Sequence, residues 1–396
     1  MGRKFSIDTY SMSMNKKGEE LCGDMVNVIY TPSKSVVVLA DGMGSGVKAN
    51  ILATLTSKII ATMLAGGASI IDCVDTITDT LPVCSERGIA YSTFTIIEVG
   101  SEGGVYTAEF DGPELIIIRD GVIDENMDKH MRVINGKNIW ECYFRAQPDD
   151  MIVTFSDGVI HAGIGQLLNL GWRRENVVEF VQRNYRKKMP ARDMTRTLMG
   201  ICDDLYEGEP GDDTTVTTVR IVPQTETRVL VGPPASRDDD RRVVDILMSA
   251  SGKKIVCGGS TSQLVARELG RPLRGDTKYY SEDVPPIAYI DGVDLVTEGV
   301  LTLTAAETLM EKYLHEVETG QKPGKYVDLE KEDGATKLVK LLADSTTDIT
   351  FMLGQANNPA YNKSDPRLGL DVKMRIVTSI AEKLEKLGRK IKLEEY

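Results

Sequence analysis

Two carboxylates of this sequence directly follow apolar strands, and glycine comes after each of them. In VVVLADGMGSGVKANILA (36–53) an apolar run stops at Asp41, and a glycine-rich turn and a helical pattern come next. In MIVTFSDGVI (151–160) Asp157 ends a second apolar run in the same way. A strand end holds a carboxylate on a rigid base, and Mg²⁺ and Mn²⁺ prefer oxygen ligands. The two aspartates are therefore candidate ligands of a hard cation.

Two further segments add carboxylates to the same pattern. EPGDDTTVTTVRI (209–221) places Asp212 and Asp213 before a third strand-like run. EELCGDMVNVIY (19–30) places Asp24 before a short apolar run. Acidic residues at several strand ends, in different parts of the chain, predict a site for Mg²⁺ or Mn²⁺.

The turn after Asp41 also fits a different chemistry. Gly44, Gly46 and Ala49 match the G-x-G-x-x-[GA] spacing of a dinucleotide-binding turn. A second helical pattern follows the first, so no second parallel strand completes that unit, and a fixed carboxylate at Asp41 would repel a pyrophosphate. A nucleotide-binding oxidoreductase and a purely structural glycine turn remain the alternative interpretations of this stretch.

Histidine and cysteine offer little alternative chemistry. With three histidines in the chain, a histidine-rich zinc site is not expected. The six cysteines contain no CxxC pair, which indicates reduced thiols. The histidines are His130, His161 and His315, and the cysteines are Cys22, Cys73, Cys84, Cys142, Cys202 and Cys257.

Length, composition and charge limit the classes of protein. The chain has 396 residues, of which 41% are hydrophobic and 27% charged, and two soluble domains are expected. The net charge of -12 disfavours a nucleic-acid-binding surface. No apolar run reaches the length of about 18 residues that a membrane span needs, and the N-terminus has no apolar signal segment. We therefore expect no membrane span and a cytoplasmic location.

The pattern of apolar residues predicts two domains. Residues 1–223 alternate strand-like and helix-like runs in an α+β pattern, with most neighbouring strands in hairpins. Residues 224–396 contain repeated βαβ units and predict a three-layer α/β domain with a regulatory or ligand-binding role. In the first domain, strands are predicted at 35–40, 91–99, 104–110, 114–121, 151–156 and 214–222, and helices at about 47–65, 69–81, 175–188 and 192–206.

The helix predicted at 47–65 carries an apolar stripe, formed by Ile51, Leu55, Ile59 and Met63. We expect this stripe to pack into the core, as the apolar face of a surface helix does. The alternative is that the second domain biases this helix and so changes the metal affinity of the carboxylates beside it.

A second glycine turn lies in the stretch KKIVCGGSTSQLVARELG, and it contains no acidic residue. The free N–H groups and the positive end of the helix that follows predict a site for a small anion. The alternative is ordinary N-capping by Ser260 or Thr261. Residues 292–302 are a candidate hairpin facing this turn. The turn residues are Gly258, Gly259, Ser260 and Thr261.

Taken together, the three aspartate motifs resemble a known family. LADGMGSGVKA, VTFSDGV and GDDTTVTTVRI are similar, in this order, to the signature segments of the metal-dependent serine/threonine protein phosphatases, the type 2C (PPM) superfamily. The DGMGSG turn resembles the bacterial branch named for stage II sporulation protein E. The resemblance covers about residues 5–222 and implies a β-sandwich flanked by helices.

The resemblance implies roles for the strand-end residues. Asp41 would bridge two Mn²⁺ or Mg²⁺ ions, and the carbonyl of Gly42 would bind one of them. Asp157 and Asp212 would hold the second ion. A water between the ions would then attack the phosphate of phosphoserine or phosphothreonine, so no protein nucleophile is needed.

Other residues match the family less closely. Asp24 would act through water. Asp213 is expected to orient Thr214 or cap the turn, and the alternative is that it also binds metal. Eukaryotic members hold the substrate phosphate with an N-terminal arginine that this chain lacks. Lys16 and Lys17 are candidates for that role, and a solvated loop is the alternative. No histidine stands at the turn after YTAEF, so the proton donor to the leaving group is not identified.

The implied function is the hydrolysis of a phosphorylated bacterial regulatory protein. A homodimer and a small anionic ligand of the C-terminal domain are further expectations. The alternative from another class is a non-catalytic, phosphatase-like module that senses metal or binds a partner. The presence of all four expected carboxylates argues against that alternative.

Overall fold

The computed structural model describes residues 4–80, 92–125, 127–276, 278, 280–281, 283–318, 327–344, 347–356 and 366–396. The chain divides into two compact units, Met1–Gln224 and Thr225–Tyr396, here called unit 1 and unit 2. Each unit has its own sheets and core. Cys84 lies outside the described residues.

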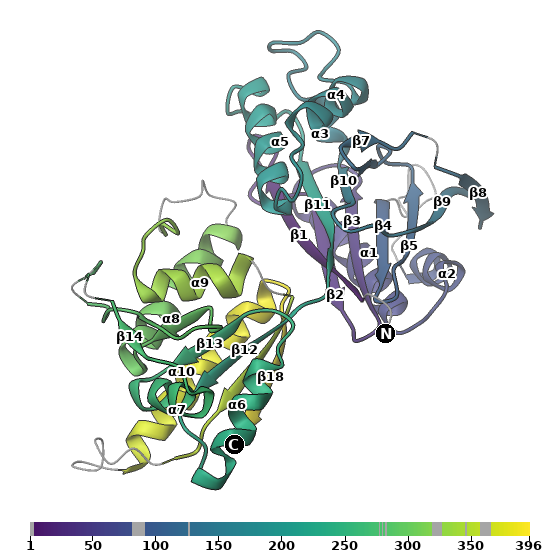
Figure 1. Cartoon of the computed structure of the whole chain (residues 1–396). Coiled ribbons are helices and arrows are strands. Elements are labelled where there is room, and N and C mark those ends of the chain that lie inside the picture. The colour runs from purple at the N-terminus through teal and green to yellow at the C-terminus, as the bar shows by residue number, and fades with distance from the viewer. Residues whose placement is uncertain are drawn as a thin grey trace. The chain divides into compact units, whose positions relative to one another are not determined.

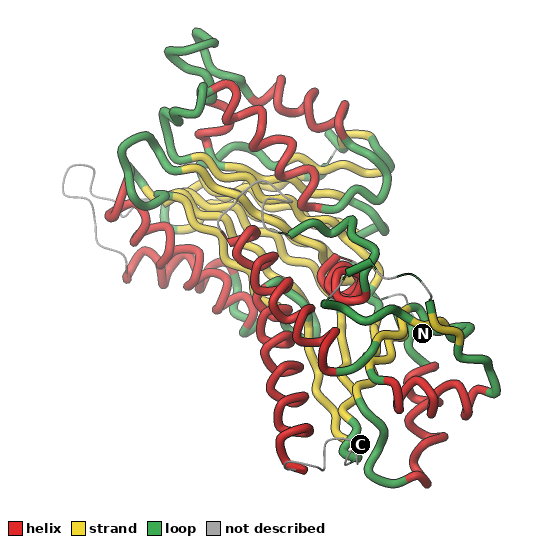
Figure 2. The backbone as a smooth tube through the Cα atoms, turned by 90° about the vertical axis from the view of Figure 1, so that its left-hand side faces the viewer, coloured by secondary structure: helices red, strands yellow, loops and turns green. Residues whose placement is uncertain are grey.

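Unit 1 is built on two antiparallel sheets that face each other (Figures 1 and 2). In sheet order, the first consists of β1 (Phe5–Met14), β11 (Thr214–Pro223), β10 (Met151–Phe155), β6 (Ile116–Arg119) and β7 (Val122–Ile123). The second consists of β2 (Asp24–Tyr30), β3 (Lys34–Gly42), β4 (Ser92–Gly100), β5 (Gly104–Phe110), β9 (Lys137–Arg145) and β8 (Lys129–Ile134).

Helices cover the outer faces of both sheets, so that unit 1 has three apolar layers. Successive strand residues point to opposite faces of a sheet. Val37 therefore packs between the sheets with Ile97, Ile152 and Val219, whereas Val36 points outward to the helices. Helices α1 (Gly46–Ala65) and α2 (Ile70–Thr80) pack on the second sheet, and α3 (Asp157–His161), α4 (Arg174–Asn184) and α5 (Ala191–Leu205) pack on the first. The predicted sandwich flanked by helices is confirmed.

The first half of helix α1 buries small residues, and the two residues of the predicted apolar stripe in that half are exposed. Ala49 and Ala53 are fully buried, whereas Ile51 is 50% exposed and Leu55 is 39% exposed. The reason is the close approach of α1 to β3: a Cβ atom on Gly42 would lie 2.1 Å from the backbone oxygen of Ala49. Only small side chains fit such a contact. The expectation that the stripe packs in the core is therefore wrong for Ile51 and Leu55, whereas Ile59 and Met63 do pack against the core.

The length and hydropathy of α1 would also suffice for a membrane span. Eight of its residues, however, are buried within unit 1. The helix is thus packed as a core element through its small-residue face.

Unit 2 is a three-layer α/β domain built on a mostly parallel sheet (Figure 1). Helices α6 (Asp240–Met248) and α7 (Gly259–Leu269) cover one face, and α8 (Val300–Glu318), α9 (Gly334–Asp344) and α10 (Pro366–Lys386) cover the other. The predicted three-layer arrangement is confirmed. In sheet order the strands are β14 (Arg274–Gly275), β15 (Ala288–Tyr289), β16 (Leu295–Thr297), β13 (Lys254–Cys257), β12 (Glu226–Val231), β17 (Asp348–Leu353) and β18 (Lys390–Glu395).

Some elements differ from those expected. Residues 292–302 are not a hairpin, because β16 ends at Thr297 and α8 begins at Val300. Strand β16 instead pairs in parallel with β13, which lies earlier in the chain. Strand β1 and the hairpin β8–β9 were not predicted, since polar residues interrupt their apolar residues.

The two faces of α1 give the first testable prediction. Ala53→Leu should lower the stability of unit 1 by about 1–3 kcal/mol, because the larger side chain overpacks a closed contact. Ile51→Ala, on the exposed face, should change it by no more than about 0.5 kcal/mol. Urea unfolding followed by circular dichroism compares the two variants. A larger loss for Ile51→Ala than for Ala53→Leu would mean that the exposed stripe is the packed face.

Candidate metal centre

The predicted carboxylates come from strand ends of both sheets. Asp24 and Asp41 lie on neighbouring strands and face each other in the register of β2 and β3. Asp157 follows β10 and is the first residue of α3. Asp212 lies just before β11, which begins at Thr214. Strands β10 and β11 are antiparallel neighbours. The end of one therefore lies beside the start of the other.

Ser156 joins the two sheets at this edge. Its hydroxyl donates a hydrogen bond of 2.6 Å to Oδ2 of Asp24, and it accepts one of 2.9 Å from the backbone N–H of Thr215. Asp24 is buried, and its Oδ1 has no partner among the described residues. The serine thus orients the Asp24 carboxylate from the opposite sheet, a role that sequence reasoning missed.

Gly158 allows α3 to approach the segment before β11. A Cβ atom at this position would lie 2.2 Å from the backbone oxygen of Asp213 and 2.5 Å from Oγ1 of Thr214. Tyr206 further fixes the turn by donating a hydrogen bond of 2.7 Å to the carbonyl of Gly158. In the Asp157–Gly158 pair, the aspartate therefore supplies a carboxylate and the glycine permits the close packing of α3.

Asp212 and Asp213 have different surroundings. Asp212 lies with Asp157 and His161, and one ligand atom from each of the three falls within 4.8 Å of the others. Asp213 is buried; its Oδ1 accepts a hydrogen bond from the backbone N–H of Lys16, and its Oδ2 has no partner among the described residues. The expectation that Asp213 orients Thr214 is wrong, because the Thr214 hydroxyl donates to the carbonyl of Asp212 instead. The ligand roles of Asp212 and Asp213 stay predictions.

Burial, and next the charges of neighbouring carboxylates, raise the pKa values of the clustered aspartates. The pKa of Asp41 is raised from 3.8 to about 8, first by burial and then by the charges of Asp24, Asp157 and Asp212. The pKa of Asp24 is raised to about 7, chiefly by burial, although the hydrogen bond from Ser156 opposes the shift. Burial and the charge of Asp212 also raise the pKa of Asp157.

Such a cluster fits divalent cations. The donors are carboxylate oxygens, and two of them, Asp24 Oδ1 and Asp213 Oδ2, are buried without a partner among the described residues. Mg²⁺ and Mn²⁺ take oxygen ligands and offset the repulsion between carboxylates. The donor set is therefore suited to the predicted ions.

Two cationic side chains near the centre also have distinct positions. Lys16 Nζ lies 3.7 Å from Oδ1 of Asp212, whereas Lys17 forms an ion pair of 2.7 Å with Glu209. Of the two candidates for binding a substrate phosphate, Lys16 is thus the one beside the carboxylates.

Cys22 lies near the same cluster and has the properties of an inert thiol. Burial, and next the charge of Asp24, raise its pKa to about 12. A thiol with so high a pKa is hardly ionised at neutral pH, and the thiolate is the nucleophile. The residue is therefore poorly suited to covalent catalysis.

The glycine turn of unit 2 lies at the start of α7. Its N-cap is Gly258, with φ of 122° and no side-chain capping bond, so the alternative of capping by Ser260 or Thr261 is wrong. Gly259 and Ser260 are exposed, whereas Thr261 is fully buried. Anion binding at Gly258–Thr261 stays a prediction.

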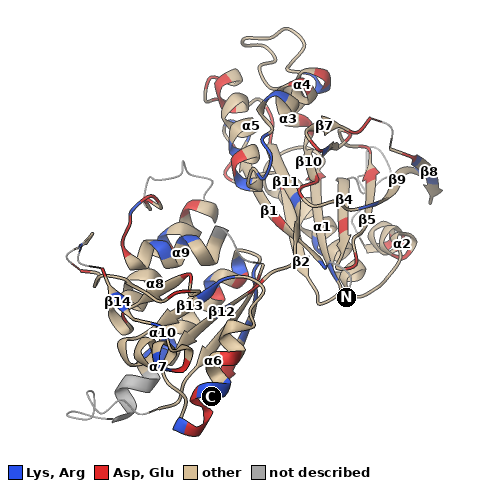
Figure 3. Ribbon diagram, in the orientation of Figure 1, with Lys and Arg blue, Asp and Glu red and all other residues tan. Residues whose placement is uncertain are grey.

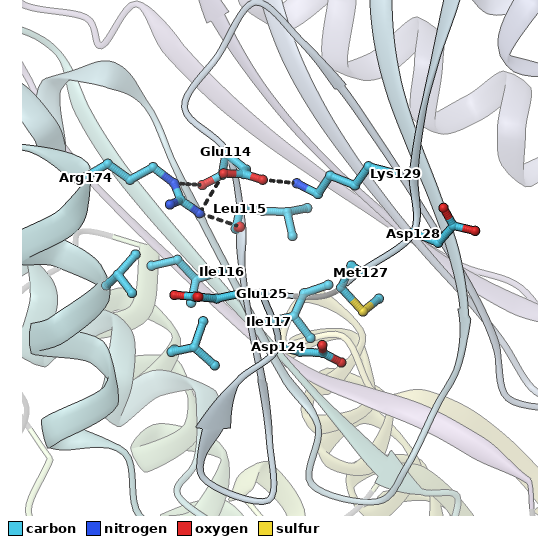
Figure 4. Close-up of a pocket in the computed structure, with 12 residues that line it drawn as sticks. Glu114, Leu115, Ile116, Ile117, Asp124, Glu125, Met127, Asp128, Lys129 and Arg174 are labelled. Carbon is cyan, nitrogen blue, oxygen red and sulfur yellow. Dashed lines mark hydrogen bonds and ion pairs between the residues drawn. The ribbon is translucent and has the colours of Figure 1, made fainter.

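A separate pocket of unit 1 lies beside β6, β7 and α4 (Figure 4). Its volume is about 450 Å³. Glu114 lies between Arg174 and Lys129, at 3.0 Å and 2.6 Å respectively, and Lys129 also pairs with Glu109. Both cations are thus paired with carboxylates, and none of the predicted site residues lines this pocket. Lysines and arginines elsewhere are interspersed with acidic residues on the helices of both units (Figure 3).

Unit 1 is similar to a known family of protein domains. Residues 31–222 match the family model described as stage II sporulation protein E. The match confirms the resemblance to this family that the three aspartate motifs indicated.

Several solved structures match the chain at low sequence identity. The phosphatase domain of the cell-fate determinant SpoIIE from Bacillus subtilis is 17% identical, with 56% of this chain and 95% of that chain covered and a TM-score of 0.44. The RsbU and RsbW domains of a Mycobacterium tuberculosis protein are 13% identical, with coverages of 62% and 69% and a TM-score of 0.46. RsbX in complex with magnesium is 14% identical, with coverages of 54% and 95% and a TM-score of 0.40. No curated protein matches the chain in sequence.

The raised pKa of Asp41 gives a prediction for metal-free protein. Because the folded state holds this proton more tightly than the unfolded state, its contribution to stability is present below pH 4 and lost as the pH rises through about 8. Asparagine cannot ionise, so Asp41→Asn should unfold at a higher temperature than the wild type at pH 9 in EDTA, and at nearly the same temperature at pH 4.

Thermal unfolding by circular dichroism provides the measurement, and Asp128→Asn, at a side chain that is 86% exposed, is the control. Each kcal/mol gained should raise the unfolding temperature by about 2–4 °C. A lower unfolding temperature for Asp41→Asn at pH 9 would contradict the mutual repulsion described above.

Proposed function

We propose that the protein is a metal-dependent phosphatase that hydrolyses phosphoserine or phosphothreonine on a bacterial regulatory protein. One observation carries the proposal: carboxylates from four separate segments of a SpoIIE-family domain meet at one edge of its sandwich. Gathering like charges costs free energy, so a fold that does it has a use for cations there.

Residues of unit 1 would hold the two metal ions. Asp41 would bridge two ions and the carbonyl of Gly42 would bind one, while Asp157 and Asp212 would hold the other. Asp24, oriented from the opposite sheet, would act through water. Two Mn²⁺ or Mg²⁺ ions held in this way supply a water of lowered pKa and offset the charge on the phosphoryl oxygens.

The competing function is a phosphatase-like module that senses metal or binds a partner without catalysis. A measurement of phosphate-ester turnover distinguishes this non-catalytic module from an enzyme. We further propose a cytoplasmic location, self-association as a homodimer and control by a small anion bound to unit 2. These follow from the sequence expectations alone.

Manganese-dependent hydrolysis of p-nitrophenyl phosphate tests the proposed activity. Asp41→Asn, Asp157→Asn and Asp212→Asn should each lower kcat by at least about 100-fold, the scale of losing one group that stabilises transition-state charge. Asp213→Asn should be milder, EDTA should abolish activity until Mn²⁺ is restored, and thiol alkylation should have no effect. Wild-type protein that binds Mn²⁺ but shows no turnover, on this compound or on phosphopeptides, would favour the non-catalytic module.

The two lysines offer a matched pair for substrate binding. Lys16→Gln should lower kcat/KM by about 10–100-fold, because one charge-assisted hydrogen bond contributes about 1.5–3 kcal/mol. Lys17→Gln should leave kcat/KM within about twofold of the wild type, since Lys17 pairs with exposed Glu209. Steady-state kinetics with a phosphopeptide make the comparison, and equal effects of the two substitutions would remove Lys16 from the substrate site.

A further inference from the structure

We propose that His161 is a nitrogen ligand of the cation held by Asp157 and Asp212, so that this position of the centre is a mixed nitrogen–oxygen site that prefers Mn²⁺ to Mg²⁺. The inference rests on the proposed metal centre. It adds a ligand that the aspartate motifs do not contain.

The geometry already brings the three donors together. One ligand atom each from Asp157, His161 and Asp212 lies within 4.8 Å of the others. Nδ1 of His161 is 3.9 Å from Oδ2 of Asp157. With metal–ligand bonds of about 2.0–2.2 Å, two donors on one ion lie up to about 4.4 Å apart. The pair therefore fits a shared ion without rearrangement of α3.

The helix holds both side chains on one side. Asp157 is the first residue of α3 and His161 the last, four positions apart, and such residues are neighbours on a helix surface. Val159 and the C-cap residue Ala162 are fully buried, which anchors this single turn. The imidazole and the carboxylate are thus presented from a short, fixed element.

The ring of His161 has no competing partner. In the part of the chain that the structure describes, its only side-chain interaction is the 3.9 Å contact with Asp157, which is too long for a hydrogen bond. Both side chains are about half exposed, at 46% and 45%, so the donors can reach an ion that enters from solvent. Lys16 contacts the same centre through Asp212 rather than through the histidine.

A nitrogen donor changes which metal is favoured. Mg²⁺ is usually bound by carboxylates and keeps several waters. Mn²⁺ shares this preference for oxygen but, as a first-row transition metal, also accepts an imidazole nitrogen. Replacing one oxygen ligand by imidazole therefore favours Mn²⁺ relative to Mg²⁺. The remaining ion position, supplied by Asp41 and the Gly42 carbonyl, keeps oxygen ligands.

The test measures metal binding to the full-length protein, apart from turnover. After EDTA treatment, Mn²⁺ is titrated and free Mn²⁺ is followed by electron paramagnetic resonance, with and without competing Mg²⁺. His161→Gln should weaken one Mn²⁺ site by at least about tenfold, and the affinity for Mg²⁺ should change by less than about threefold. His161→Asp, which returns an oxygen donor, should restore binding with the preference shifted toward Mg²⁺.

A spectroscopic measurement detects the proposed nitrogen ligand directly. In wild-type protein carrying ¹⁵N-labelled histidine, pulsed electron paramagnetic resonance of bound Mn²⁺ should show coupling to one imidazole nitrogen. The coupling should disappear in His161→Gln and persist in His130→Gln, which alters an exposed histidine outside the centre.

The outcomes separate this inference from the proposed function. If wild-type protein binds Mn²⁺ and hydrolyses phosphate esters without nitrogen coupling, the histidine is not a ligand and the function stands. If His161→Gln keeps its Mn²⁺ affinity but loses kcat with an altered pH profile, the ring acts on a proton and the inference is overturned. If the wild type neither binds Mn²⁺ nor turns over substrate, both proposals fail together.

Discussion

Repulsion among carboxylates gathered at one edge of the sandwich is the constraint to which the rest of unit 1 is adapted. Burial and neighbouring charge raise the pKa of Asp41 to about 8, so these groups would move apart if their supports were flexible. The supports are strand ends and one helical turn anchored by buried Val159, and all of them are fixed by apolar packing. A rigid sandwich is what allows an unfavourable arrangement of charges to persist.

Close backbone contacts complete that rigidity. Gly42 lets α1 pack directly against the strand that carries Asp41, and Gly158 lets α3 pack against the segment that carries Asp212 and Asp213. The same glycines follow the two strand-end aspartates in the sequence. The DG pairs therefore combine a charged group with the absence of a side chain that would hold its neighbour away.

Local sequence predicts the carboxylates well, because a strand, a charged end and a glycine turn are contiguous in the chain. It could not reveal Ser156 beside Asp24, since 132 residues separate them and only the packing of the two sheets unites them. His161 was visible as a residue but not as a neighbour of Asp212. Ile51 and Leu55 of the α1 stripe are exposed, against expectation, because periodicity reports an apolar face, whereas the close approach of this half of α1 to β3 admits only small side chains.

The pairing of β1 with β11 determines when the centre can form during synthesis. Phe5 lies opposite Pro223 in this pairing. The first strand of unit 1 can therefore pair only after the last strand has been synthesised. The serine that orients Asp24 likewise receives its own hydrogen bond from Thr215, at the start of that last strand. A nascent chain must therefore release nearly all of unit 1 from the ribosome before its aspartates can assemble. Incomplete chains carry the motifs but cannot bring the aspartates together, so the carboxylate cluster assembles only when the final strand is complete.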